Sequence, residues 1–275
     1  MTRITPVPRE RRHTLHFLRY ARGHSPVFLD TEVDMSAVRR DREQARVHER
    51  PPSWVTYVLH AAGRVLAAHP EANAALCGRL RPRLVRYDNV HAKLAFDKEL
   101  NGVRVVLTGL IPDVHIATLR DIQERIDGVR DGDPARLPEF GGARLMHRLP
   151  PVLGSAMFRS VAHSPRQRLG VLGTLAVTSL GHRPVDGFYS NGGTTITLGL
   201  GRVADRPVVR DGALGIAPTM RLSMAFDHRV IDGAAAADLM GDLVDALEGF
   251  PADPPADPGP AVAAQPVGAA HGTNR

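Results

Sequence analysis

The chain has 275 residues, of which 43% are hydrophobic and 23% are charged, and its formal net charge at pH 7 is +6. This composition is typical of one large or two small globular domains and excludes disorder throughout the chain. Cys77 is the only cysteine, which excludes a disulfide scaffold and a zinc site built from several thiolates.

The charge pattern and the hydropathy pattern argue against membrane and nucleic-acid partners. No apolar run approaches the ~20 residues that span a bilayer, and the N-terminal segment has prolines and arginines where a signal peptide has an apolar stretch. The arginines are scattered and only 5% of residues are aromatic, so no stacking surface for nucleic acid is visible. We therefore expect a soluble, cytoplasmic protein without nucleic-acid or membrane partners, although the positive charge suits an acidic ligand.

Helices and strands alternate along the predicted chain. Period-two or β-branched patterns predict strands at residues 27–33, 103–107, 172–179, 194–203 and 219–226. Apolar residues at helical spacing predict helices over 53–68, with Ser53 as the N-cap, and over 116–126, ended by Asp127 and Gly128. A third helix begins after Gly233, with Leu239, Leu243 and Leu247 as its apolar stripe, and ends at Gly249.

Three further segments complete the predicted organisation. Residues 207–212 are typical of a hairpin arm followed by a turn. Residues 134–168 contain several prolines and amphipathic pieces, which favour short helices forming a peripheral arm or lid. The tail at 251–275 is rich in Pro and Ala and lacks large apolar residues, so we expect it to be disordered. The folded domain then occupies residues 1–250.

The sequence SMAFDHRVIDG at residues 223–233 is the most informative motif. His228 follows a strand end and precedes a turn, so its ring can project into a cleft while the strand holds it. Its pKa range suits a base that accepts a proton from a thiol or hydroxyl. Asp232 can pair with an arginine and hold the turn, and Gly233 permits close packing or a positive φ. A solvent-facing turn is the alternative, and a metal site lacks further ligands at suitable spacing.

Residues 223–243, SMAFDHRVIDGAAAADLMGDL, closely resemble the signature of the dihydrolipoyl acyltransferase catalytic domain of 2-oxo acid dehydrogenase complexes. The His-x-x-x-Asp-Gly pattern also occurs in chloramphenicol acetyltransferase. Three more segments resemble that family in the same order: FLDTEVDMSAV at 28–38, HPEANAAL at 69–76 and GTLAVTSLGH at 173–182. The resemblance implies a chloramphenicol acetyltransferase-like α/β fold, an α+β two-layer sandwich in which a mixed sheet packs against helices.

The resemblance also implies roles for particular residues. His228 matches the general base, and Thr178 matches a hydroxyl residue that stabilises the oxyanion, where the family usually has Ser. A packing role for Thr178 in its strand is the alternative. Asp232 matches the acid that braces the loop, and its expected partner is Arg12, with Arg11 as the second choice. Both arginines could instead be solvated charges.

Three departures weaken the transfer of substrate identity from the family. The catalytic region begins near Met1, so we expect no lipoyl domain, no subunit-binding domain and no lipoyl attachment in this chain. The family's Gly-Leu-hydrophobic-Pro-Val strand is replaced by NGVRVVLTGLIPD, and the arm at 134–168 is unlike the usual family sequence.

The expected function is that of a stand-alone acyltransferase that moves an acyl group between a coenzyme A thioester and a thiol or small-molecule acceptor, with no metal. The acceptor could be a lipoyl group on another chain. The resemblance implies a homotrimer with the site between subunits. A catalytically silent trimeric scaffold of a dehydrogenase complex is the alternative. A peptide-forming condensation domain shares the motif, but it needs two copies of the fold.

Overall fold

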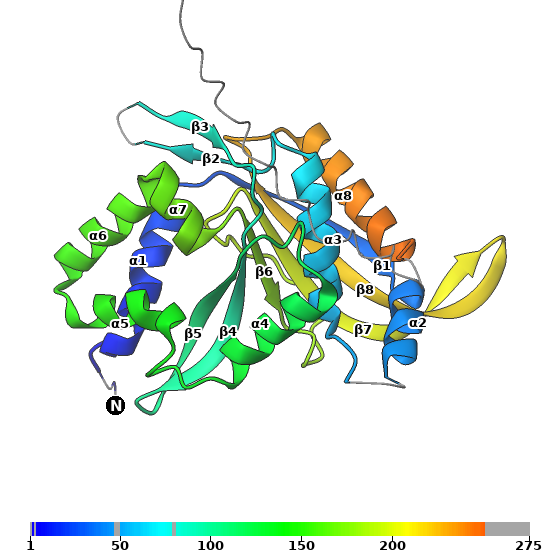
Figure 1. Ribbon diagram of the computed structural model, residues 1–275, viewed down its shortest axis with the longest axis horizontal. Coiled ribbons are helices and arrows are strands. Elements are labelled where there is room, and N and C mark those ends of the chain that lie inside the picture. The colour runs from blue at the N-terminus through cyan, green and yellow to red at the C-terminus, as the bar shows by residue number, and fades with distance from the viewer. Residues whose placement is uncertain (1, 3, 47–49, 79–80, 251–275) are drawn as a thin grey trace, which may run out of the picture.

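A six-stranded mixed sheet forms the centre of the computed structural model, which describes residues 2, 4–46, 50–78 and 81–250. The pairs β4–β6 and β6–β7 are parallel, and the other neighbouring strands are antiparallel. In spatial order the strands are β1 (Pro26–Asp34), β8 (Ala213–Asp227), β7 (Ile196–Arg210), β6 (Leu175–Ser179), β4 (Ala92–Leu100) and β5 (Val103–Ile111). The predicted mixed sheet packed with helices is confirmed (Figure 1).

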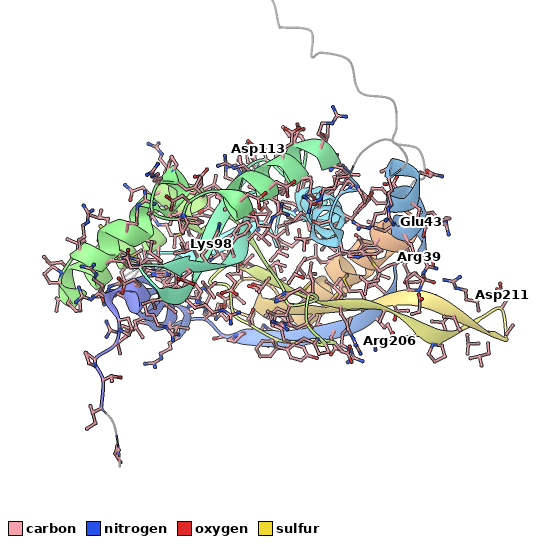
Figure 2. The ribbon with its side chains drawn as sticks, turned by 90° about the horizontal axis from the view of Figure 1, so that it is seen from below. Arg39, Glu43, Lys98, Asp113, Arg206 and Asp211 are labelled. Atoms are coloured by element: carbon pink, nitrogen blue, oxygen red, sulfur yellow. The ribbon has the colours of Figure 1, made fainter. Side chains whose placement is uncertain are left out.

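Four helices cover one face of this sheet, as Figures 1 and 2 show. They are α2 (Ser36–Ala45), α3 (Trp54–Ala68), α4 (Leu119–Asp131) and α8 (Gly233–Glu248). The backbone amide of Thr56 donates to the Ser53 hydroxyl, which confirms the predicted N-cap of α3. The predicted stripe on α8 is also confirmed, because Leu239, Leu243 and Leu247 are all buried in the main core.

The predicted arm is a group of short helices beside the sheet. It contains η2 (Pro138–Phe140), α5 (Gly141–Arg148), α6 (Pro151–His163) and α7 (Pro165–Leu172). Of these, α5 and α6 pack against α1 (Arg12–Ala21), which follows the turn η1 (Arg9–Arg11) (Figure 1). A small separate core joins Phe158 and Leu172 of the arm to Phe17 and Tyr20 of α1.

The strands β7 and β8 extend beyond the sheet as a hairpin, with Asp211 at its tip (Figure 2). Asp211 and Gly212 form the two-residue turn of this hairpin, and their φ angles are 51° and 79°. Positive φ angles at both turn residues match the right-handed twist of the two strands. The hairpin predicted at residues 207–212 is therefore confirmed, although both strands are longer than expected. A second, two-stranded sheet pairs β2 (Ala74–Cys77) with β3 (Arg83–Arg86).

The structure corrects several predicted boundaries. The helix expected at 116–126 is α4, which starts later and continues past Gly128, where an added Cβ would meet no atom within 4 Å. The strand expected from residue 172 starts at Leu175, because α7 runs to Leu172 and Gly173 then turns with a φ of +68°. The strands β2, β3 and β4 were not predicted. The tail at 251–275 lies outside the described residues.

The two faces of the main sheet differ in side-chain size. Strand alternation places large apolar residues toward the helices and small or polar residues on the opposite face. That opposite face carries Ala176, Thr178, Thr197 and Ser223. The loop after β6 crosses it, since an added Cβ on Gly199 would meet the Phe188 carbonyl oxygen at 2.5 Å. Strand β6, which carries Thr178, and strand β8, which ends one residue before His228, both contribute to this face.

Candidate active site

His228 lies directly after β8, where the backbone fixes the start of the turn. Its amide donates to the carbonyl oxygen of Ser25 at 2.9 Å, which ties the turn to the start of β1. The side chain is 47% exposed, and its Nδ1 lies 3.4 Å from Oδ1 of Asp232. This contact favours the tautomer with hydrogen on Nδ1, which leaves the Nε2 lone pair available as a base.

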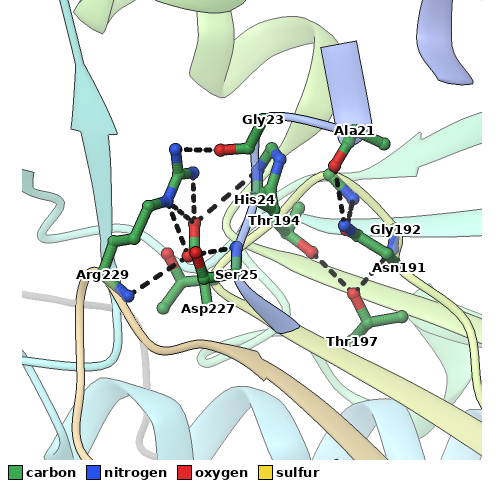
Figure 3. A network of polar contacts seen from close by, with 12 residues as sticks. Ala21, Gly23, His24, Ser25, Asn191, Gly192, Thr194, Thr197, Asp227 and Arg229 are labelled. Atoms are coloured by element: carbon green, nitrogen blue, oxygen red, sulfur yellow. Dashed lines mark hydrogen bonds and ion pairs between the residues drawn. The ribbon is translucent and has the colours of Figure 1, made fainter. Parts of the chain in front are cut away.

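A buried carboxylate beside His228 holds this turn in place. Asp227 is 4% exposed and accepts hydrogen bonds from the Ser25 amide at 3.2 Å and from the Arg229 guanidinium at 2.5–3.2 Å. Arg229 also donates to the Gly23 carbonyl oxygen (Figure 3). Burial raises the pKa of Asp227, but the hydrogen bonds from Arg229 and Ser25 outweigh it, so the pKa is lowered. The ionised Asp227 therefore joins the His228 turn to the segment after α1.

His24 adds a neutral ring to the same network. Its Nε2 lies 3.9 Å from Asp227 Oδ2 and both side chains are 4% exposed. Burial lowers the pKa of His24 to about 4, although the charge on Asp227 opposes this. His24 is therefore uncharged at neutral pH. Sequence reasoning missed Asp227, Arg229 and His24 as supports of the turn, although the first two adjoin His228 in the motif.

Thr178 lies near the end of β6, half-buried, on the face opposite the helices. The register pairs it with Gly199 of β7, which in turn pairs with Ser223 of β8. His228 lies five residues beyond Ser223. At ~3.4 Å per residue and ~4.8 Å per strand, His228 and Thr178 are roughly 20 Å apart. The base and the hydroxyl that the sequence predicts for one reaction do not meet within one chain.

The predicted pairing of Arg12 with Asp232 is wrong. Arg12 donates from Nη1 to the carbonyl oxygens of His147 and Leu149, at 3.1 and 3.2 Å. Its guanidinium lies at the C-terminal end of α5, where helix carbonyl groups attract a cation. Among the described residues Asp232 forms an ion pair with His228, and the Asp232 side chain is 89% exposed. Within the same residues Arg11 forms no ion pair or hydrogen bond with Asp232.

Gly233 also has a different role from the one predicted. It is the first residue of α8, its φ is not positive, and an added Cβ would meet no atom within 4 Å. Close packing therefore does not require glycine here. In the described part of the chain, no three side chains of His, Cys, Asp or Glu gather as metal ligands. No helix among these residues combines the length and apolar character needed to cross a membrane.

One family model is similar to part of this chain. Residues 159–253 match the family model described as 2-oxoacid dehydrogenases acyltransferase (catalytic domain). The resemblance predicted from the sequence is confirmed over these residues. The matched segment includes Thr178, His228 and Asp232.

Proteins that are similar in sequence match this chain over a short segment only. The dihydrolipoyllysine-residue acetyltransferase component of the pyruvate dehydrogenase complex of Bacillus subtilis (strain 168) is 48% identical over 46 residues, which is 17% of this chain and 10% of that protein. The corresponding component of Staphylococcus aureus is also 48% identical over 46 residues, 17% of this chain and 11% of that protein. The matched segment thus spans about a tenth of the length of these curated relatives.

Solved structures share the fold over most of the chain. A dihydrolipoamide acetyltransferase of Azotobacter vinelandii has a TM-score of 0.67 at 20% identity, covering 90% of this chain and 92% of that one. A probable dihydrolipoamide acetyltransferase of Listeria monocytogenes has a TM-score of 0.65 at 16% identity, covering 90% and 95%. The predicted fold class is confirmed.

Proposed function

We propose that this protein transfers an acyl group between a coenzyme A thioester and an acceptor thiol, such as a dihydrolipoyl group, or a small-molecule acceptor. His228 carries the proposal, because its backbone is fixed at a strand end, its ring is exposed, and its Nδ1 lies 3.4 Å from Oδ1 of Asp232. The match of residues 159–253 to an acyltransferase family supports the same reaction class.

The proposed reaction begins with proton transfer. Nε2 of His228 takes the proton of the acceptor thiol, and the sulfur attacks the thioester carbonyl carbon. The carbonyl oxygen becomes an oxyanion, which the Thr178 hydroxyl stabilises by donating a hydrogen bond. The tetrahedral intermediate collapses, the bond to the coenzyme A sulfur breaks, and the departing sulfur takes the proton from Nε2. Asp232 stabilises the protonated ring between these two transfers.

The separation of roughly 20 Å between His228 and Thr178, estimated from strand spacing, means that one chain cannot supply both groups to one carbonyl. We therefore propose a site between subunits of a homotrimer, with His228 from one copy and Thr178 from its neighbour. Threefold closure joins two different surfaces of each subunit, so each interface can form one site. A lipoyl domain on another chain is the proposed macromolecular partner, and the cytoplasm is the proposed location.

An acyl-transfer assay separates this proposal from the silent-scaffold alternative. Free dihydrolipoamide and a panel of acyl-CoA donors are incubated with the protein, and the acylated product is quantified by chromatography. We expect turnover that falls by about 10²–10⁴ in His228→Ala. The matched control is His69→Gln, because His69 lies at the end of α3 on the helix side of the sheet. Equal turnover in His228→Ala and wild type would contradict the mechanism, and no turnover with any donor would favour the scaffold.

A further inference from the structure

Lys93 lies on the same face of the sheet as Thr178. It is in β4 and pairs with Ala176 of β6, two residues before Thr178. Along the strand and across one strand spacing, the Cα atoms of Lys93 and Thr178 are roughly 8 Å apart. A group bound at Lys93 would therefore lie next to the carbonyl that Thr178 is proposed to polarise.

The Lys93 ammonium is buried without a carboxylate. The residue is 5% exposed, and Nζ donates to the Gly192 carbonyl oxygen at 2.5 Å. Nζ also lies 4.9 Å from the centre of the Phe17 ring. Among the described residues Lys93 forms no ion pair. Its ammonium group can donate three hydrogen bonds, but its polar contacts are one carbonyl oxygen and one aromatic ring.

Arg168 of α7 places a second cation beside the first. It is 2% exposed and donates from Nη2 to the Gly193 carbonyl oxygen at 3.0 Å. Its Nε and Nη1 atoms are buried and have no hydrogen-bond partner. The two cations thus bind successive carbonyl groups of one turn, and the described part of the chain supplies no acid to either.

Burial and the neighbouring cation disfavour the ammonium form of Lys93. Burial, and then the charge on Arg168, lower the pKa of Lys93 to about 7, so the neutral amine is also populated near pH 7. A carboxylate bound beside both groups would favour the ammonium form and would pair with the Arg168 guanidinium. A carboxylate could accept from Lys93 Nζ and from the unpartnered Nε or Nη1 of Arg168 at the same time.

We infer that Lys93 and Arg168 form a specificity site for the terminal carboxylate of a dicarboxylic acyl group, such as succinyl or glutaryl. This inference rests on the proposed function, because Thr178 then polarises the thioester carbonyl of the same acyl chain. The Phe17 ring lies against Nζ at the same place. Acyl groups without a terminal charge leave the two cations unpaired.

The first test measures binding and does not require turnover. The melting temperature of the full chain is recorded with succinate, with propionamide as the neutral analogue that lacks a carboxylate, and with sodium chloride at matched ionic strength. We expect succinate to raise the melting temperature by about 2 °C or more, and propionamide to leave it near the chloride value. Lys93→Met should abolish the rise. Succinate and chloride giving the same melting temperature in the wild-type protein would overturn the inference.

Lys98→Met is the matched control, because Lys98 is the other lysine of β4 (Figure 2). Its Nζ donates to the carbonyl oxygens of Arg130 and Gly132, away from Arg168. This variant should keep the succinate-induced rise. If Lys93→Met does not fold, Lys93→Gln takes its place, since it keeps a polar group but removes the charge.

The second test measures turnover with succinyl-CoA and acetyl-CoA. The inference predicts that Lys93→Met lowers kcat/KM for succinyl-CoA by about 10- to 100-fold, chiefly through KM, and leaves acetyl-CoA within about threefold. Wild-type turnover with acetyl-CoA but not with succinyl-CoA would refute the specificity site and leave the proposed function intact. Succinate stabilisation that depends on Lys93, without turnover of any donor, would refute the proposed function and keep the anion site.

Discussion

Asp227→Asn tests whether the buried carboxylate holds the His228 turn. The substitution keeps the shape of the side chain but removes its charge. Asp227 is 4% exposed and receives two contacts from Arg229 Nε, at 2.8 and 3.2 Å, and one from Nη2 at 2.5 Å. An amide can accept at only one of its two positions, so at least one of these bonds is lost and the guanidinium loses its counterion.

The expected loss of stability follows from the burial of the two partners. Removing one member of a fully buried ion pair costs about 3–5 kcal/mol. The Arg229 side chain is 33% exposed, so water compensates part of its charge. We therefore expect the free energy of unfolding to fall by about 2–3 kcal/mol, a shift of roughly 4–12 °C in melting temperature for a domain of this size. Activity should fall as well, because the Ser25 contacts that position His228 loosen.

Urea denaturation and thermal melting measure this loss directly. Asp205→Asn is the matched control, because Asp205 pairs with Arg39 at 3.0 Å while their side chains are 63% and 42% exposed. Exposed pairs contribute only about 0–1 kcal/mol, so the control should melt close to the wild type. If both variants lost the same stability, or if Asp227→Asn were within about 0.5 kcal/mol of the wild type, the role assigned to Asp227 would be refuted.

Four further predictions follow from particular contacts. Thr178→Ala should lower kcat by about 10²-fold while Thr178→Ser stays near wild type, and equal losses in steady-state kinetics would indicate packing instead. Gly173→Ala should lower the melting temperature, since its φ is +68° and an added Cβ would meet the His91 carbonyl oxygen at 2.3 Å; an unchanged melting curve would contradict the strain. Burial lowers the pKa of His24 and of His147 to about 4, which is below the value of an unfolded histidine. The folded state therefore resists protonation of these rings, so their contribution to stability is complete above pH 6.5 and is lost as the pH falls toward 4. The melting temperature should decline across that range, and the decline should be smaller in His147→Gln than in the wild type. Deleting residues 253–275 should change neither activity nor melting temperature, and a drop of several degrees would show that the tail docks.

The elements with strong local patterns could be predicted from the sequence. Ser53 and the apolar spacing after it define α3, and the leucines after Gly233 define α8. His228 and Asp232 are four residues apart, so their proximity is a local property of one turn. The strand β4 was missed because buried Lys93 interrupts its apolar pattern.

Contacts between distant segments could not be predicted in the same way. The Ser25 amide and Asp227 are 202 positions apart, and no local pattern connects them. Arg12 was assigned to Asp232 by resemblance, but the arm at 134–168 departs from the family, and its α5 carbonyl groups bind this arginine. The separation of Thr178 from His228 depends on the order of β6, β7 and β8 in the sheet. Only the folded topology shows that one chain does not bring them together.

Mixing two inactive variants tests the shared site most directly. His228→Ala retains Thr178, and Thr178→Ala retains His228, so neither variant alone can form a complete site. After subunit exchange verified by mass or label, random trimers should carry complete sites at about a quarter of their interfaces, and acyl transfer should recover toward that fraction of wild-type turnover. No recovery after verified exchange, or a monomer by light scattering that retains full activity, would contradict a site built from His228 of one subunit and Thr178 of its neighbour.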